Sequence, residues 1–200
     1  MKYAFVVNRN AGKGSAVKKW TALEARVAEL FEDYSVVYDL APIATDADVV
    51  VAVGGDGTVH YVVNHLMRGN RRAALGILPL GSGCDFARNF ETDDALAVLA
   101  RGETKAIDVG EIESAGNKMW FANVADAGMG AEVTRQMANH SRNYLFSTLK
   151  ALVGYKNVDV RLSADGEEVY AGPLKCLVIA NGKYFGDGMG IAPDAVLDDG

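Results

Sequence analysis

Hydrophobic residues in the first half of the chain occur in short unbroken runs, and most runs are followed by apolar residues at helical spacing. Unbroken runs of small and β-branched residues predict strands buried on both faces, as in a parallel sheet. These runs are Tyr3–Asn8, Tyr34–Leu40, Val49–Val53 and Ala73–Pro79. Three- and four-residue spacing predicts helices between and after the strands. The predicted helices are Val17–Leu30, Val59–Arg68 and Asp93–Arg101.

The pattern changes near Glu103, where apolar and polar residues begin to alternate. Alternation predicts half-buried antiparallel strands, and two glycine-containing turns, at 115–117 and 164–166, predict hairpins. The predicted strands are Lys105–Glu111, Lys118–Val124, Val158–Ser163 and Leu174–Asn181. The sequence therefore predicts an α/β domain with an open, mostly parallel sheet over residues 1–102 and a mainly antiparallel, β-rich second domain over residues 103–200.

The link from Asp39 to Asp48 does not fit this alternation of strands and helices. Parallel strands are usually joined by a crossover of a dozen or more residues, most often a helix. This link is shorter and contains Pro42. We therefore expect an irregular connection.

The stretch Gly54-Gly55-Asp56-Gly57-Thr58 directly follows the most apolar predicted strand. Glycines between a strand and a helix allow backbone N–H groups and a helix N-terminus to approach a phosphate. Asp56 would repel a bare phosphate, so its carboxylate suits a Mg²⁺ ion carried by a nucleotide or an attacking hydroxyl. The alternative is a tight turn with a capping aspartate and no ligand.

Two further glycine-rich turns follow predicted strands. Leu80–Arg88 contains a second glycine turn with a carboxylate, Asp85, and Asn8–Ser15 contains a third, which lacks the spacing of a P-loop. Open α/β sheets bind ligands at the carboxyl ends of their strands. We therefore expect Gly55 and Gly57 to lie near Ser82 and Gly83 at one edge of the sheet.

Composition limits the classes of function. The net charge of −6 argues against a general nucleic-acid binder, and no apolar run approaches the length that spans a membrane. Two distant cysteines suggest a reducing, cytoplasmic setting. Residues 133–158 lack acidic side chains, so they form either a solvated surface or a surface for anionic lipid. The basic residues of this stretch are Arg135, Arg142, Lys150 and Lys156. The C-terminal Asp198-Asp199-Gly200 resembles a turn before another strand, so we expect a fragment.

Several ordered motifs resemble the diacylglycerol kinase catalytic-domain family, which includes sphingosine kinases and bacterial lipid kinases. The resemblance rests on Gly54–Asn64 and Pro79–Arg88, with Asn8 and Ala11–Gly14 before them. Later blocks of the family are similar to Ile107–Gly110, Asn123 with Gly128, and Ile191–Gly200. The resemblance covers nearly the whole chain.

The resemblance implies an ATP-dependent lipid kinase that transfers the γ-phosphate to the hydroxyl of diacylglycerol or a related lipid at the inner membrane face. It implies a nucleotide-binding domain followed by a β-sandwich-like domain, with Mg²⁺ as the metal. The implied ATP contacts are Asn8, Gly54, Gly55, Asp56, Gly57, Thr58, Val59, His60, Tyr61 and Ser82. Asp56 is implied as catalytic, and the implied metal ligands are Asp85, Asp108, Asp199 and the carbonyl of Val196. A homodimer is compatible with this assignment.

The chain also departs from the family pattern. Tyr61 stands where the family usually has Glu, and Cys84 stands where it has Asn. Thr45 is a poor substitute for a nucleotide-contacting threonine, and the acidic motif with the family's base is absent, since Asp165-Gly166-Glu167 lies in a hairpin turn. An NAD kinase-like phosphotransferase and a nucleotide-binding protein without catalysis are the alternative functions. We expect Asp56 to matter for transfer but little for stability.

Overall fold

The computed structural model describes residues 1–39, 43, 46–69, 72–128 and 156–200. The chain forms two compact units. Unit 1 contains Met1–Asn123 and Asn181–Gly200, and unit 2 contains Val124–Ala180. The boundary expected after residue 102 stays a prediction, and each unit is described by itself.

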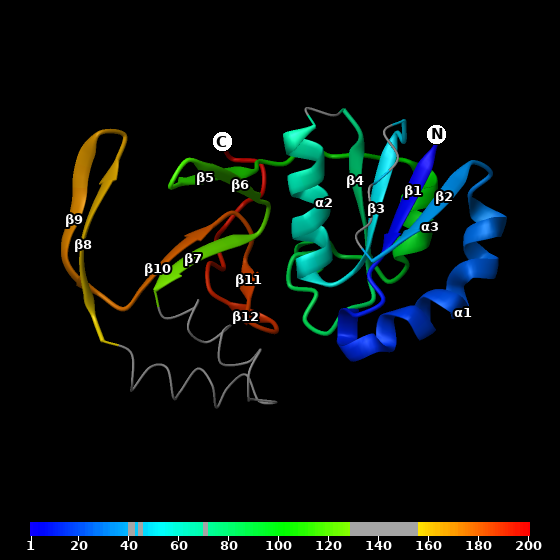
Figure 1. Ribbon diagram of the computed structural model, residues 1–200, viewed down its shortest axis with the longest axis horizontal. Coiled ribbons are helices and arrows are strands. Elements are labelled where there is room, and N and C mark those ends of the chain that lie inside the picture. The colour runs from blue at the N-terminus through cyan, green and yellow to red at the C-terminus, as the bar shows by residue number, and fades with distance from the viewer. Residues whose placement is uncertain (40–42, 44–45, 70–71, 129–155) are drawn as a thin grey trace. The chain divides into compact units, whose positions relative to one another are not determined.

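Unit 1 contains a four-stranded parallel sheet with the strand order β2-β1-β3-β4 (Figure 1). The strands are β1 (Tyr3–Val7), β2 (Tyr34–Tyr38), β3 (Val49–Gly54) and β4 (Ala74–Pro79). The central strands β1 and β3 are buried along their whole length, as their unbroken apolar runs require. The predicted parallel sheet is confirmed.

Helices cover both faces of this sheet. Residues of α1 (Ser15–Leu30) and α3 (Ala95–Arg101) share one apolar cluster with alternate sheet residues such as Phe5 and Val51. The other sheet face, including Val6 and Val50, packs against α2 (Asp56–Arg68). Short 3-10 turns, η1 (Ala11–Gly14) and η2 (Ala87–Asn89), follow two of the strands. Helix α2 begins earlier than predicted, so Asp56 and Gly57 belong to its first turn.

The hairpin predicted around residues 115–117 is confirmed. Strands β5 (Gly110–Ser114) and β6 (Asn117–Phe121) pair antiparallel, and Ala115 and Gly116 both have positive φ, at 50° and 75°. Positive φ at both loop positions characterises the type I′ turn, which suits a two-residue hairpin. The strand predicted over Lys105–Glu111 is wrong except at its last two residues, since β5 begins at Gly110 and the Asp108 N–H donates to the Leu197 carbonyl instead of a neighbouring strand (2.7 Å).

Residues 181–200 return to the first part of the chain and belong to unit 1. They contain the short hairpin of β11 (Tyr184–Phe185) and β12 (Met189–Gly190). Asparagine side chains hold this segment: Asn181 Nδ2 donates to the carbonyls of Asp108 and Ala122, both at 2.8 Å. Asn89 Oδ1 accepts the Lys183 N–H at 2.9 Å. Another asparagine, Asn64 of α2, binds both backbone groups of Trp120 in β6.

Unit 2 consists, in its described part, of two antiparallel strand pairs. Strands β7 (Val124–Gly128) and β10 (Cys176–Ala180) form one pair, and β8 (Val158–Ala164) and β9 (Glu167–Leu174) form the other. The turn predicted at residues 164–166 is confirmed, with positive φ at Asp165 and Gly166. The basic positions Arg135, Arg142 and Lys150 lie outside the described residues, and so do Thr45 and most of the 39–48 link.

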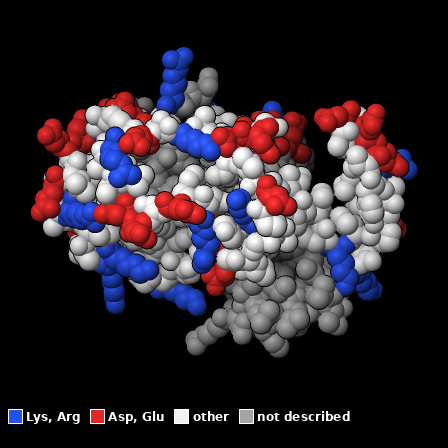
Figure 2. Space-filling view, turned by 180° about the vertical axis from the view of Figure 1, so that it is seen from behind, with Lys and Arg blue, Asp and Glu red and all other residues white. Residues whose placement is uncertain are grey.

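Acidic and basic side chains are interspersed over the face shown in Figure 2. Within the described ranges, no helix has the length and apolar character needed to cross a membrane. Single exposed hydrophobic side chains occur in both units, as is normal for a globular chain.

Candidate functional site

The strand order places a topological switch between β1 and β3. The chain leaves β1 toward the neighbouring strand β2, whereas it leaves β3 toward β4 on the other side. Such switch points open a crevice at the carboxyl ends of the strands, where open α/β sheets bind ligands. Here Asn8 follows β1, and its Nδ2 donates to Thr58 Oγ1 of α2 at 3.2 Å. The glycine turn that begins at Asn8 and the one that ends at Thr58 therefore meet at the switch.

The turns after β3 and β4 pack backbone against backbone. The N–H groups of Leu80 and Gly81 both donate to the Gly54 carbonyl at 2.9 Å. A Cβ at Gly81 would lie 2.5 Å from the Gly55 Cα, and a Cβ at Gly54 would lie 2.3 Å from Thr58 Oγ1. These glycines are needed because any side chain would push the turns apart. The expected proximity of the two glycine turns is thus observed at Gly55 and Gly81.

Gly57 differs from these packed glycines. No heavy atom lies within 4 Å of the position its Cβ would take, and its φ is not positive. Gly57 also lies within α2, where glycine weakens a helix by about 1 kcal/mol relative to alanine. Among the described residues, packing gives no reason for glycine at this exposed position. A ligand that approaches the backbone closely would give one.

Two helices begin at this edge without a side-chain cap. The N-cap of α2 is Gly55 and that of α1 is Gly14, and neither helix start has a side-chain hydrogen bond. The first N–H groups of a helix have no partner within the helix, and they carry the positive end of its dipole. This is the arrangement that binds phosphate and other anions at a helix N-terminus.

The Asp56 carboxylate joins the two turns. Its Oδ2 accepts the Asp85 N–H at 3.0 Å and its Oδ1 accepts the Phe86 N–H at 2.8 Å. Each oxygen keeps lone-pair capacity, and the side chain is only partly buried. Asp56 therefore fits a role as a Mg²⁺ ligand, since Mg²⁺ prefers carboxylate oxygens.

The Asp85 carboxylate makes contacts that the sequence did not reveal. The residue is 6% exposed; Oδ2 accepts the Asp187 N–H at 2.9 Å and Oδ1 accepts the Gly188 N–H at 2.6 Å. Arg88 Nε lies 3.5 Å from Oδ1. Asp85 therefore fastens the 186–188 turn to the edge, and its burial leaves it a poorer fit for direct metal binding. The Gly186-Asp187-Gly188 stretch was the only signal for this contact.

The remaining predicted metal ligands meet at a second place within unit 1. Asp108 Oδ2 accepts the Gly200 N–H at 2.9 Å, beside the turn that contains Val196 and Asp199. Lys105 Nζ pairs with Asp198 Oδ1 at 2.8 Å in the same turn. Within the part of the chain that the structure describes, no three His, Cys, Asp or Glu side chains are grouped to hold a metal. The metal assignments stay predictions.

Other predicted nucleotide contacts divide by their burial. Val59 is 6% exposed within the core, and Tyr61 packs against the same apolar cluster, whereas His60 and Ser82 are exposed.

Burial raises the pKa of the Cys84 thiol, and the Asp56 charge raises it further, so the thiol is protonated at neutral pH. Its Sγ donates weakly to the Gly54 carbonyl at 3.6 Å.

Comparison with known proteins agrees with this architecture. Probable lipid kinases described as YegS-like are 30% identical over 169 residues in Yersinia enterocolitica and 31% over 166 residues in Cronobacter sakazakii. These matches cover 78% and 77% of this chain, but 56% and 54% of the relatives. The chain thus spans about half the length of the curated relatives it matches.

A solved structure described as a diacylglycerol kinase from Bacillus anthracis superposes with a TM-score of 0.75 at 25% identity. The superposition covers 100% of this chain and 70% of that one. Residues 122–200 match the YegS C-terminal NAD kinase beta sandwich-like domain, so the predicted fold class is confirmed. Residues 2–112 match the diacylglycerol kinase catalytic domain, and the chain belongs to that family.

Proposed function

We propose that this chain is the nucleotide-binding part of a kinase that transfers the γ-phosphate of ATP to a lipid hydroxyl. One observation carries the proposal: at the switch point, α2 begins uncapped at Gly55, with an open Gly57 and the Asp56 carboxylate in its first turn. Family membership supports phosphoryl transfer, and the names of the curated relatives support a lipid acceptor.

The residues at the carboxyl edge of the sheet would have different roles in binding. The N–H groups at the start of α2 would bind the phosphates, and Gly57 would let them approach the backbone. Asn8 would fix the entrance of the crevice through its bond to Thr58. Asp56 would hold Mg²⁺, which neutralises phosphate charge when bound and makes the γ-phosphate easier to transfer. Asp56 is therefore the proposed catalytic residue.

A lipid acceptor implies work at a membrane surface. We propose peripheral contact with the cytoplasmic face, with the hydroxyl presented to the edge of the sheet. The predicted basic stretch over residues 135–156 would add attraction to anionic lipid. Because the chain spans about half the length of its curated relatives, we separate binding from transfer in the test below.

Calorimetry of ATP with Mg²⁺ tests the binding step on this chain. Wild type should bind, and Gly57→Val should lose binding at least about tenfold, because the new side chain fills the space where a phosphate would lie. Valine suits a helical φ at position 57, so the melting temperature should change little.

Ala25→Val is the matched control, because Ala25 is an exposed helical position on α1. It should leave both ATP binding and stability unchanged. Absence of ATP binding to wild type, or equal binding by wild type and Gly57→Val, contradicts the proposal. ATP binding without transfer, in the longest available form of the protein, would instead favour a nucleotide-binding protein without catalysis.

A further inference from the structure

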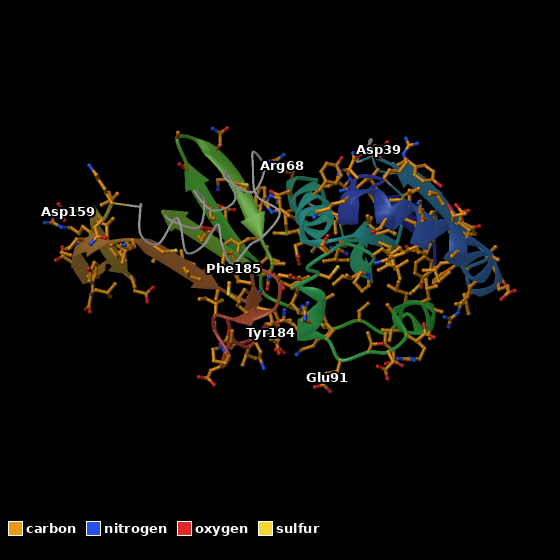
Figure 3. All side chains as sticks on the ribbon, turned by 90° about the horizontal axis from the view of Figure 1, so that it is seen from below. Asp39, Arg68, Glu91, Asp159, Tyr184 and Phe185 are labelled. Carbon is orange, nitrogen blue, oxygen red and sulfur yellow. The ribbon has the colours of Figure 1, made fainter. Side chains whose placement is uncertain are left out.

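The turn at Gly186–Gly188 holds an aspartate in a conformation that side chains rarely adopt. Gly186, Asp187 and Gly188 have φ values of 62°, 70° and 95°. Glycine adopts such angles freely, whereas a residue with a Cβ adopts them at a cost in free energy. In Figure 3, the labelled Tyr184 and Phe185 mark the strand that leads into this turn. Two backbone bonds to the Asp85 carboxylate then fix the turn in place.

The Asp187 carboxylate therefore lies at the edge of the sheet where the glycine turns after β3 and β4 meet. Its side chain is 68% exposed. The position that a Cβ of Gly83 would take lies 3.8 Å from Asp187 Oδ1 and 3.5 Å from Asp56 Oδ2. Both carboxylates therefore lie within van der Waals reach of the space where Gly83 lacks a side chain. A group that binds to Asp187 is thus held next to the proposed phosphate site.

Arg88 limits what Asp187 can bind. Its Nη2 lies 3.9 Å from Asp187 Oδ1, and its Nε donates to the Gly83 carbonyl at 3.3 Å. The guanidinium partly compensates the charge of Asp187 without a close hydrogen bond. The carboxylate therefore keeps acceptor capacity, and a neutral donor such as a hydroxyl can occupy it.

Hydrocarbon surface follows directly along the chain. Met189 is 42% exposed and Ile191 is 45% exposed, at alternate positions beyond Asp187. The Ile191 N–H donates to the Lys183 carbonyl at 3.0 Å, which fixes this strand against β11. An acceptor for a hydroxyl and an apolar surface thus occur together on one short hairpin.

We propose that Asp187, Met189 and Ile191 form the acceptor subsite of the proposed lipid kinase. Asp187 accepts a hydrogen bond from the alcohol of the lipid and orients its oxygen toward the phosphate site. Met189 and Ile191 contact the hydrocarbon next to that alcohol. The inference rests on the proposed function, and it assigns to this subsite a hydroxyl group with hydrocarbon next to it.

Binding of dioctanoylglycerol below its micelle concentration, measured by calorimetry, tests the carboxylate. Asp187→Gly removes the side chain and also suits the positive φ, so it should fold normally and bind about tenfold more weakly. Asp187→Asn keeps an acceptor oxygen and should lose only a few-fold. Asp194→Asn, at an exposed position of the same segment, should bind as wild type does.

The apolar part of the subsite has a closely matched control. Met189→Gln should weaken dioctanoylglycerol binding several-fold. Met67→Gln should not, although Met67 is also a methionine with 42% exposure. Met67 lies near the end of α2, roughly 16 Å along the helix from its start.

ATP binding distinguishes this inference from the proposed function. All these variants should bind ATP with Mg²⁺ at least as tightly as wild type does, because none of them removes a proposed phosphate contact and loss of the Asp187 charge only reduces repulsion of the phosphates. If wild type fails to bind dioctanoylglycerol, or if Asp187→Gly and Met189→Gln bind it as tightly as wild type, the acceptor subsite is wrong even when ATP binds. If dioctanoylglycerol binding follows the expected order while ATP does not bind, the subsite stands and the kinase proposal fails.

Discussion

Helices α2 and α3 differ in whether a side chain accepts a hydrogen bond from the N–H groups of the first turn. Helix α3 begins with Asp94, whose Oδ1 accepts the Ala97 N–H at 3.1 Å, while Arg26 pairs with the same carboxylate. Helix α2 begins at Gly55, without a side-chain cap, although Asp56 is the next residue. The Asp56 carboxylate accepts the N–H groups of Asp85 and Phe86 instead of those of its own helix.

This difference separates a helix start that only supports the fold from one that can bind a ligand. A capped start has used an N–H group and placed a negative charge at the positive end of the dipole. At the start of α2 the Thr58 N–H donates to the Gly55 carbonyl at 2.9 Å and no N–H group of the first turn has a side-chain acceptor, while the aspartate holds the neighbouring turn. Three changes, from the largest expected effect to the smallest, test whether the two starts differ in this way.

Gly81→Ala should have the largest effect on stability, because it disrupts the backbone packing between the turn after β4 and the start of α2. The new Cβ would lie 2.5 Å from the Gly55 Cα and 2.7 Å from the Gly55 nitrogen, and neither backbone can move alone. We expect a loss of about 3 kcal/mol in the free energy of unfolding, measured by urea denaturation. Ser82→Ala, at the exposed neighbouring position, should change it by less than about 0.5 kcal/mol. Equal stability of the two variants would show that the turns do not pack as described.

Asp56→Asn should have the second largest effect. One of the two N–H groups, of Asp85 or Phe86, would face an amide NH₂ and lose its acceptor. We expect a loss of about 1–3 kcal/mol in the free energy of unfolding, together with weaker binding of ATP with Mg²⁺. This replaces the expectation that Asp56 matters little for stability, which assumed that the side chain had no structural partner.

Thermal unfolding of Asp56→Ala beside Asp56→Asn sharpens that result. The alanine variant leaves both N–H groups without their acceptor and should melt at the lower temperature. If both variants have the same melting temperature as wild type, the hydrogen bonds of Asp56 between the two turns do not stabilise unit 1.

Asp94 should show the smallest effect, and the effect should depend on pH. The hydrogen bond from Arg26, and then the Ala97 N–H, lower the pKa of Asp94 in the folded state. A lowered folded pKa gives stability that is present above the unfolded pKa, about 4, and is lost as pH falls through the folded value. Asp94→Asn keeps the cap but removes this charge.

The melting temperature measures this difference. At pH 7, Asp94→Asn should melt a few degrees below wild type, and Asp94→Ala lower still, because alanine also removes the cap. The gap between Asp94→Asn and wild type should close as the pH approaches 3. A gap that stays constant with pH would mean that the ion pair with Arg26 does not contribute.

Local patterns were sufficient for much of the fold. The unbroken apolar runs identified β1 and β3 because a strand buried on both faces cannot alternate. The Asp165-Gly166 and Ala115-Gly116 turns were readable because positive φ at both loop positions restricts the residues allowed. Three glycine turns after three strands were enough to predict a shared edge, since parallel strands end on the same side.

The tertiary structure alone decided what individual residues do at that edge. Gly57 and Gly81 look alike in the sequence, but one is open and the other is packed against Gly55. Asp85 meets Asp187 across a separation of 102 residues, and no periodicity in the sequence records such a contact. Apolar spacing reports burial along one element, whereas the partners of a carboxylate depend on how distant loops pack together. For that reason the sequence was sufficient to locate the candidate site at one edge of the sheet, and the packing of the loops decided which side chains at that edge remain exposed.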